Sequence, residues 1–424
     1  MIQSACLPCG VRVVTEEMPG ARAACIGLWI GAGSAKEEMD QAGISHFIEH
    51  MMFKGTETRS AKQIAVDVDD LGASINAFTG KEATCYHIKA LSEHFPKAVD
   101  ILLDMLCNSV FDPVEINKER GVILEEMQMI QDTPDDHIID LLSQSVLKDS
   151  GLAPSIIGTK SSLGRMSRPK MIRYIENHYT RDNIVVSVVG SFDRAALFEQ
   201  LERALAPFPE KSLSVPDSDP SPGQRYNSKS KDIGQTHIAI GRQGVSLGSE
   251  LYYAQAIAND VLGGSMSSRL FQNIREERGL AYSVYSAASS YRRTGMYFIY
   301  AGIGCGKEEE TLSAIETELS ILRREGLDQE NIEVVKQRLK SGYVFSLESM
   351  NGRMYRLGKN MLLLNRIFTS EEVMADIDAV SLDEVQEICR QIGDFSSYSG
   401  VSISRKKLNL KHMMSGMSTT GETQ

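Results

Sequence analysis

The sequence predicts an α+β protein built from two similar halves, and three observations lead to this fold class. Apolar patterns typical of strands and of amphipathic helices alternate along residues 1–206. Residues 207–231 are rich in Pro, Ser, Asp, Lys and Gly and show no apolar period, which is typical of a linker. A similar order of elements then restarts over 232–404. We therefore expect an internal duplication of two domains, followed by a disordered tail over 405–424.

The first half is expected to begin with two strands and to mix strands with helices. Strands are expected at 10–17, where valines alternate with polar residues, and at 23–33, a more buried apolar run. Ser60 can cap a helix that runs to residue 71, and a short turn between strands at 73–79 and 83–91 predicts a hairpin. The remaining elements are helices at 98–110, 113–131, 136–147, 167–179 and 194–205, with a β-branched strand at 183–190.

The second half is expected to repeat this order with a different chemistry. After the linker, a strand is predicted at 236–240 and a helix at 251–262. Strands at 281–290 and 295–303 correspond to the hairpin of the first half, and helices follow from residue 307 onward. Only the first copy carries an H-x-x-E-H pattern, at residues 46–50.

The composition is typical of a globular protein whose partner is not nucleic acid. The 424 residues are 42% hydrophobic and 24% charged, and the formal net charge is -11. The chain starts without a visible secretory signal and has no run of about 18 apolar residues, so we expect a cytoplasmic protein that does not contact membranes. The seven cysteines are expected to be reduced thiols, and Cys6 and Cys9 form a lone C-x-x-C pair before the first strand.

The stretch 43–53 carries the strongest functional signal. Read as a helix, it places His46 and His50 four residues apart on one face, close enough to bind one metal ion. Glu49 precedes the second histidine, and its carboxylate can reach a water molecule at such an ion. The other residues are largely apolar, so the helix is expected to be buried and its imidazoles to need a compensating cation. The alternative is a pair of satisfied core histidines, and a catalytic zinc site still requires a third protein ligand.

A second helix, predicted over 113–131, offers that ligand. Glu119 and Glu126 are seven residues apart, which is two helical turns, and therefore face the same way. One of them can bind the ion while the other supports the site. Glu125 points about 100° away and is expected to be solvated, although a swap with Glu126 stays open at this point. Taken alone, an acidic helix face is more often a wet surface.

Three segments together resemble the pitrilysin, or insulinase, family of zinc peptidases. They are the H-F-I-E-H motif at 46–50, the F-K-G-T sequence at 53–56 and the acidic segment at 119–126. The likeness covers almost the whole chain and is closest to the short-chain branch, the bacterial relatives of the mitochondrial processing peptidase β subunit. In that family the third ligand follows the second histidine by about 76 residues, which is the position of Glu126, and a further glutamate stands seven residues earlier, as Glu119 does.

The resemblance implies a zinc-dependent endopeptidase with one Zn²⁺ per chain. His46, His50 and Glu126 would bind the ion, Glu49 would act as the general base, and Glu119 would orient a ligand or the water. Each half would hold a mixed, mainly antiparallel sheet with helices packed on one face.

The resemblance also implies how substrate is bound. Asn76, Ala77, Phe78 and Thr79 match an edge strand, to which an extended peptide or an unfolded protein segment adds as a further strand. Gly263 and Gly264 match a glycine-rich recognition loop of the family, and no nucleotide-binding pattern surrounds them. Arg275 and Tyr282, seven residues apart, match a pair that binds substrate and polarises the scissile carbonyl.

Short members of the family work as pairs of chains, so we expect a homodimer with a closed chamber and two composite sites. Arg275 and Tyr282 would then serve the zinc ion of the partner. The alternatives are a catalytically silent scaffold and a peptide-binding subunit that captures without cutting, and the complete set of zinc ligands with its glutamate favours the enzyme. The sequence leaves open the physiological substrate, a second type of subunit and the metal loaded in vivo.

Overall fold

The computed structural model describes residues 2–215 and 218–417 and divides the chain into two compact units. Unit 1 comprises Met1–Gln128, Pro154–Asp217 and Tyr343–Thr369, and unit 2 comprises Met129–Ala153, Ser218–Gly342 and Ser370–Gln424. About 50% of the residues are helical and 21% are in strands. The predicted α+β class is therefore confirmed.

Unit 1 is built on a six-stranded mixed sheet in the order β1-β2-β6-β3-β5-β4. The strands β2 and β6 run parallel, and the other neighbours are antiparallel. Because β4 is the last strand, one of its edges is free of other strands of this sheet. The bounds are β1 (Ile2–Cys6), β2 (Arg12–Glu17), β3 (Ala23–Ile30), β4 (Ser74–Thr79), β5 (Thr84–Leu91) and β6 (Ile184–Gly190).

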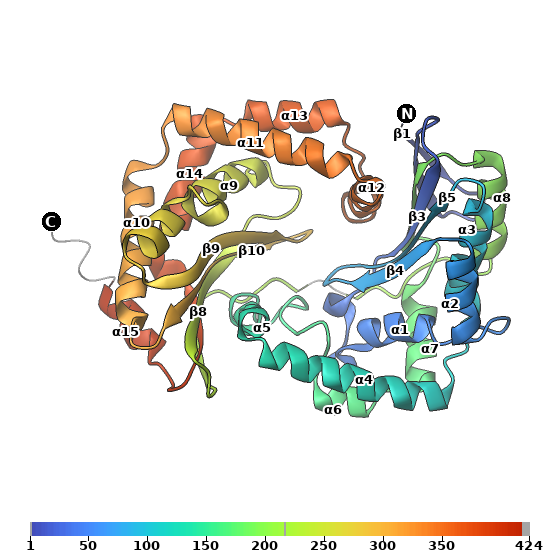
Figure 1. Ribbon diagram of the computed structural model, residues 1–424, viewed down its shortest axis with the longest axis horizontal. Helices are drawn as coiled ribbons and strands as arrows, with labels where there is room; N and C mark the ends of the chain where they lie inside the picture. Colours follow the sequence, from blue (N-terminus) through green and yellow to red (C-terminus); the bar gives the residue numbers. More distant parts are fainter. Residues whose placement is uncertain (1, 216–217, 418–424) are drawn as a thin grey trace. The chain divides into compact units, whose positions relative to one another are not determined.

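Helices cover both faces of this sheet (Figure 1). On one face, the buried hydroxyl of Tyr86 in β5 lies 2.9 Å from that of Tyr179, just beyond α7 (Arg168–His178). On the other face, Cys25 and Trp29 of β3 pack against α12 (Met350–Leu364). The sequence predicts helices on one face only, and the structure adds α12 on the other face. The other helices here are α1 (Ile44–Met52), α2 (Ala61–Asp70), α3 (Phe95–Asn108), α4 (Pro113–Asp132), α6 (Lys160–Gly164) and α8 (Arg194–Leu205).

Unit 2 repeats the arrangement with a five-stranded sheet in the order β7-β11-β8-β10-β9. Its one parallel pair, β7 with β11, corresponds to β2 with β6, and its other pairs are antiparallel. The predicted pair of similar halves is thus confirmed. The strands are β7 (Tyr226–Ser230), β8 (Gln235–Gly244), β9 (Ala281–Ser290), β10 (Gly295–Gly304) and β11 (Ser399–Ser404), and the helices are α9 (Tyr252–Asn259), α10 (Glu308–Glu325), α11 (Gln329–Leu347), α13 (Ser370–Ala379), α14 (Leu382–Ile392) and α15 (Leu410–Met417).

Each half of the sequence lends one helix to the sheet of the other half. The helix α5 (Pro134–Val146) lies against β8 in unit 2, where Gly241 leaves room for it: a Cβ there would be 2.9 Å from Leu142 Cδ2. The helix α12 lies against the sheet of unit 1, where Gly358 sits on the Trp29 indole. In Figure 1 the orange-red α12 accordingly lies beside blue strands. The compact units therefore do not follow the expected boundaries, 1–206 and 232–404.

Four local expectations differ from the structure. The predicted linker contains β7, a polar strand without an apolar period, and the predicted helical region after residue 307 contains the buried, serine-rich strand β11. The C-x-x-C pair does not precede the first strand, because Cys6 ends β1 and Cys9 follows it. Part of the expected tail is the helix α15, whose Leu410 and Met414 are buried, while residues 418–424 lie outside the described residues.

Two further expectations concern cysteines and membranes. All seven cysteines are free thiols in the structure, with Cys6 exposed and Cys9 buried. Within 2–215 and 218–417, no helix combines the length and the apolar character needed to cross a membrane.

Candidate active site

The helix α1 carries the H-x-x-E-H motif, and its first turn is held from outside the helix. It starts after Gly43, whose φ of 91° suits glycine and whose lack of a side chain leaves the helix without an N-cap oxygen. The buried carboxylate of Glu37 takes that role, because it accepts hydrogen bonds from Gly43 N at 2.6 Å and Ser45 N at 2.9 Å. Ser45 Oγ also lies 2.9 Å from Tyr174 Oη. The start of the histidine helix is therefore fixed by contacts with two other segments.

The side chains of His46, His50 and Glu126 converge in unit 1. Ligand atoms of the three residues all lie within 4.8 Å of one another, so the group could hold a metal ion. His46 Nε2 is 3.7 Å from one Glu126 oxygen, and His50 Nε2 is 3.5 Å from the other. Glu125 is exposed on α4, and it is Glu126 that faces the two imidazoles.

The spacing and the chemistry of these donors fit zinc. Two ligands bound tetrahedrally at about 2.1 Å are separated by about 3.4 Å, close to the two distances above. Two nitrogens and one carboxylate form a common ligand set of catalytic zinc sites, which leave a fourth position for water. Both imidazoles are partly buried, with 12% of the His46 side chain and 22% of the His50 side chain exposed. A cation here would compensate the acidic groups that α4 brings to them.

The two histidines differ in how they hold protons. Burial, and then the nearby His50, lower the pKa of His46 to about 4, so this imidazole is neutral and ready to bind metal at neutral pH. Burial also acts to lower the pKa of His50, but its hydrogen bonds with Glu126 and Glu119 outweigh that effect and raise it. In return, the contact with His50 lowers the pKa of Glu126. A proton on His50 therefore occupies the electrostatic position that a metal ion would take.

Glu49 lies beside these donors and contacts the edge strand of the sheet. The hydroxyl of Thr79, the last residue of β4, donates a hydrogen bond of 2.5 Å to Glu49 Oε2. Burial raises the pKa of Glu49, and the bond from Thr79 partly offsets this rise. A carboxylate with a raised pKa next to a metal site suits a general base that works near neutral pH.

Glu119 supports His50 from behind. It is buried, with 5% of its surface exposed, and its Oε1 lies 2.9 Å from His50 Nδ1. Because a carboxylate only accepts, Nδ1 donates the proton and leaves Nε2 free for a metal. The second oxygen of Glu119 forms an ion pair of 2.7 Å with Lys54 Nζ. By contrast, His46 Nδ1 is buried without a hydrogen-bond partner among the described residues.

The edge strand β4 brings its last residue, Thr79, to this centre, and the other three predicted residues, Asn76, Ala77 and Phe78, precede it in the strand. Thr79 contacts Glu49, and Phe78 is 38% exposed. The side chain of Asn76 accepts a hydrogen bond of 2.8 Å from Ala77 N. That amide is satisfied by a neighbouring side chain and not by a strand, as expected where β4 forms the edge of the sheet.

The other predicted site residues belong to unit 2. Arg275 lies in a π-helical turn, Phe271–Glu277, and its guanidinium stacks 4.7 Å from the ring centre of Phe271 and 5.5 Å from that of Tyr282. Tyr282 is 75% exposed near the start of β9. The structure thus brings Arg275 and Tyr282 together in a unit different from that of the histidines.

The glycine pair in unit 2 is explained by close packing. Gly263 and Gly264 end a second π-helical turn, Asp260–Gly264. A Cβ on Gly263 would overlap the backbone nitrogen of Ser286, and one on Gly264 would lie 3.1 Å from the Asn259 side chain. The fold therefore requires glycine at Gly263, whereas at Gly264 the Asn259 side chain would only have to shift slightly.

Sequence reasoning missed four contacts of the site. The hydrogen bond from Thr79 to Glu49 and the bonds from Gly43 and Ser45 to Glu37 join segments that no periodicity relates. The Lys54 to Glu119 ion pair had only a weak local signal, because Lys54 stands four residues after His50 but lies beyond the end of the helix.

Solved structures share this fold over nearly the entire chain. One, described as a peptidase M16 inactive domain from Pseudomonas fluorescens, matches with a TM-score of 0.89 at 18% identity, covering 96% of this chain and 98% of that one. Another, a protease from Helicobacter pylori, matches with a TM-score of 0.87 at 19% identity, covering 95% and 99%. At these identities the likeness establishes the fold.

Sequence relatives and family models establish the family to which the chain belongs. The zinc protease YmxG of Bacillus subtilis, described as uncharacterized, is 40% identical over 383 residues, which is 90% of this chain and 93% of the relative. A zinc protease of Streptomyces coelicolor, also described as uncharacterized, is 33% identical over 91% of this chain and 86% of its own length. Residues 12–160 match the insulinase (peptidase family M16) model and residues 165–339 match the peptidase M16 inactive domain model. The chain therefore belongs to the insulinase family of metallopeptidases, peptidase family M16.

Proposed function

We propose that this protein is a zinc-dependent endopeptidase of the inverted H-x-x-E-H type. One observation carries the proposal: donor atoms of His46, His50 and Glu126 converge beside the carboxylate of Glu49. The ligands come from α1 and α4, and Glu119 and Thr79 orient the side chains around them. The membership in a peptidase family and the zinc protease names of the relatives support the same reading.

Zinc, when bound by these three residues, supplies a Lewis acid that acidifies water and polarises a carbonyl. The residues of the chain then divide the proton transfers. Glu49 takes a proton from the attacking water, because its raised pKa makes it an effective base, and returns that proton to the leaving amine. Thr79 holds Glu49 in place through one carboxylate oxygen, while Glu119 fixes the tautomer of His50.

An extended peptide would bind by adding a strand to β4. In an antiparallel pair, successive residues point their backbone groups alternately to the two sides of the strand. The hydrogen bond from Ala77 N to the Asn76 side chain marks Ala77 as outward-facing, and alternation then makes Thr79 outward-facing as well. A backbone carbonyl of the incoming strand would replace the Asn76 side chain as the acceptor of the Ala77 N–H, and the strand would continue past Glu49. Backbone pairing of this kind accepts many sequences.

We further propose a homodimer with composite sites, in which Arg275 and Tyr282 serve the metal centre of the partner chain. The support is that one chain carries both the metal ligands and the stacked Arg275 and Tyr282 pair. Mixing a Glu49→Gln variant with an Arg275→Ala variant tests this assignment. If exchanged heterodimers regain no activity, the two groups do not act in trans.

The proposed activity is tested with an internally quenched peptide, before and after chelation and with zinc restored. We expect hydrolysis that chelation abolishes and zinc recovers. A protein that loads zinc and binds the peptide without cutting it would be a capturing subunit, and one that does neither would be a scaffold.

A further inference from the structure

Lys54, just beyond the end of α1, forms an ion pair with Glu119, the carboxylate that contacts His50. It stands one residue beyond Phe53, the C-cap of the helix, and four residues after His50. Its Nζ lies 2.7 Å from Glu119 Oε2, while the other oxygen of that carboxylate is 2.9 Å from His50 Nδ1. A continuous chain of contacts therefore runs from Lys54 through Glu119 to His50.

Glu119 needs this partner because it is buried. With 5% of its surface exposed, its charge is removed from most of the water that would solvate it. Lys54 is 30% exposed at its side chain and supplies an opposite charge on the side away from His50. Each carboxylate oxygen then has its own donor, which fixes the rotation of the group.

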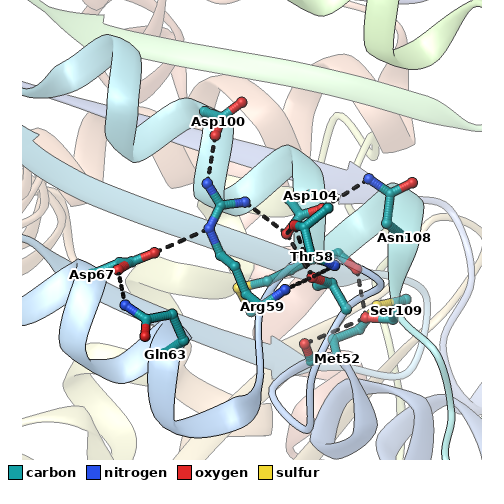
Figure 2. Close-up of polar contacts among 11 residues, drawn as sticks. Met52, Thr58, Arg59, Gln63, Asp67, Asp100, Asp104, Asn108 and Ser109 are labelled. Atoms are coloured by element: carbon teal, nitrogen blue, oxygen red, sulfur yellow. Dashed lines mark hydrogen bonds and ion pairs between the residues drawn. The ribbon is translucent and has the colours of Figure 1, made fainter.

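Hydrogen bonds and ion pairs of the loop 53–60 fix the position of the Lys54 backbone. Its backbone nitrogen donates to Met51 O at 3.0 Å, and the following Gly55 has a φ of 115°, which allows the chain to turn. Two residues on, the Thr56 hydroxyl donates to Asp104 of α3 at 2.7 Å, and Arg59 donates to the same carboxylate at 2.7 Å. Figure 2 shows the guanidinium of Arg59 between three carboxylates, those of Asp67, Asp100 and Asp104.

We propose that Lys54 is a positioning residue of the metal centre. It holds the Glu119 carboxylate so that the second oxygen accepts the proton of His50 Nδ1, which aims His50 Nε2 at the ion. This inference rests on the proposed zinc site. The alternative is that Lys54 and Glu119 form an ordinary surface ion pair. In that case the loss of Lys54 would leave the zinc affinity unchanged.

A double-mutant cycle on zinc affinity tests the proposal. The dissociation constant is measured by chelator competition for the wild type, Lys54→Met, Glu119→Gln and the double variant. We expect each single variant to weaken zinc about 10- to 100-fold, as loss of such supporting contacts does, and the double variant to be no weaker than Glu119→Gln alone. An unchanged affinity in Lys54→Met, or additive losses in the double variant, overturns the proposal.

Two matched variants separate positioning from folding and charge. Lys54→Arg keeps the charge and should stay within about threefold of the wild type in zinc affinity. Lys118→Met removes the same charge from an exposed position on α4, where Lys118 pairs with Glu115, and should leave zinc affinity unchanged. Equal losses in Lys118→Met and Lys54→Met would show a general charge effect and contradict the proposal.

A readout in the metal-free protein keeps this inference distinct from the proposed function. At a pH above the pKa of His50, where the metal-free imidazole is neutral, its side-chain ¹⁵N shifts should report a proton on Nδ1 in the wild type and in Lys54→Arg, and a mixture of tautomers in Lys54→Met. If the wild type binds no zinc, the proposed function fails whatever the tautomer. If it binds zinc and the His50 tautomer is the same in Lys54→Met, the inference about Lys54 fails alone.

Discussion

The two units share one arrangement of strands but differ in the side chains placed beside it. The strands β2, β3, β4, β5 and β6 correspond to β7, β8, β9, β10 and β11 in chain order and in pairing. In unit 1, the helix after the second strand carries His46 and His50, and α4 brings Glu126 to them. In unit 2, the equivalent helix α9 leads into Asp260, which forms an ion pair of 2.6 Å with Arg338 of α11.

The difference shows how the same fold offers candidate metal ligands in one half and an internal ion pair in the other. In unit 2 the acidic residue next to the equivalent helix receives a permanent positive charge from an arginine side chain, so it needs no cation from solution. In unit 1 the acidic residues Glu119 and Glu126 face two imidazoles. A neutral imidazole does not compensate a carboxylate, so this group needs a bound cation or a proton on a histidine. The family model that matches most of the second half carries the description of an inactive domain, which agrees with this contrast.

The largest expected effect comes from removing the base in unit 1. Glu49→Gln keeps the shape of the side chain but cannot take a proton, so peptide hydrolysis should fall by about 10²- to 10⁴-fold while zinc content stays unchanged. Glu125→Gln, the same change at an exposed position of α4, is the control and should retain activity. Equal activity in the two variants would remove Glu49 from the mechanism.

The pH dependence of zinc affinity should distinguish the two histidines. The pKa of His50 is raised, so below this pKa a proton must leave His50 before metal binds, and affinity should fall by about tenfold per pH unit. The pKa of His46 is about 4, so His46 stays neutral and adds nothing to the slope above about pH 5. Chelator competition between pH 8 and pH 5 measures this slope. A slope of two protons would mean that both imidazoles are charged in the metal-free site.

A third test addresses the exchanged helices. Gly358→Ala places a methyl group on the buried Trp29 indole, so the free energy of unfolding should fall by about 1–3 kcal/mol. The control is Gly342→Ala in α11, where no atom lies within 4 Å, and this change should stabilise the protein by about 0.5–1 kcal/mol. Denaturant unfolding measures both. A stabilising effect at Gly358 would contradict the close contact of α12 with the sheet of unit 1.

The smallest effect is expected from the ion pair of unit 2. Arg338 is 39% exposed at its side chain, so Asp260→Asn should lower stability by about 1 kcal/mol or less. Zinc content should stay within twofold of the wild type, since the pair belongs to the other unit. Loss of zinc in this variant would break the contrast between the units.

The sequence predicted best what a single helix determines. The spacing of His46, Glu49 and His50 fixes their relative positions as soon as α1 forms, and the seven-residue spacing of Glu119 and Glu126 does the same on α4. That α4 lies against α1 is a tertiary fact, which periodicity alone could not give and which the family resemblance supplied. The same holds for the contact of Thr79 with Glu49 and for Glu37 at the start of α1.

Two strands that sequence reasoning missed both lack an apolar run. The strand β7 is polar because it lies at the edge of its sheet, and β11 is an interior strand beside it that is rich in serine. Ser402 of β11 is satisfied by a hydrogen bond of 2.8 Å with Ser228 of β7, so the two strands support each other across more than 170 residues. The exchange of α5 and α12 was missed for a different reason: nothing local marks which sheet a helix covers.

Metal analysis of the purified chain tests the central claim most directly. The wild type should hold one zinc ion per chain, and variants His46→Ala and Glu126→Ala should hold none, whereas Asp260→Asn should keep one. Zinc that stays at the wild-type level in both His46→Ala and Glu126→Ala would show that the ion binds elsewhere, and the site described in unit 1 would not be the metal centre.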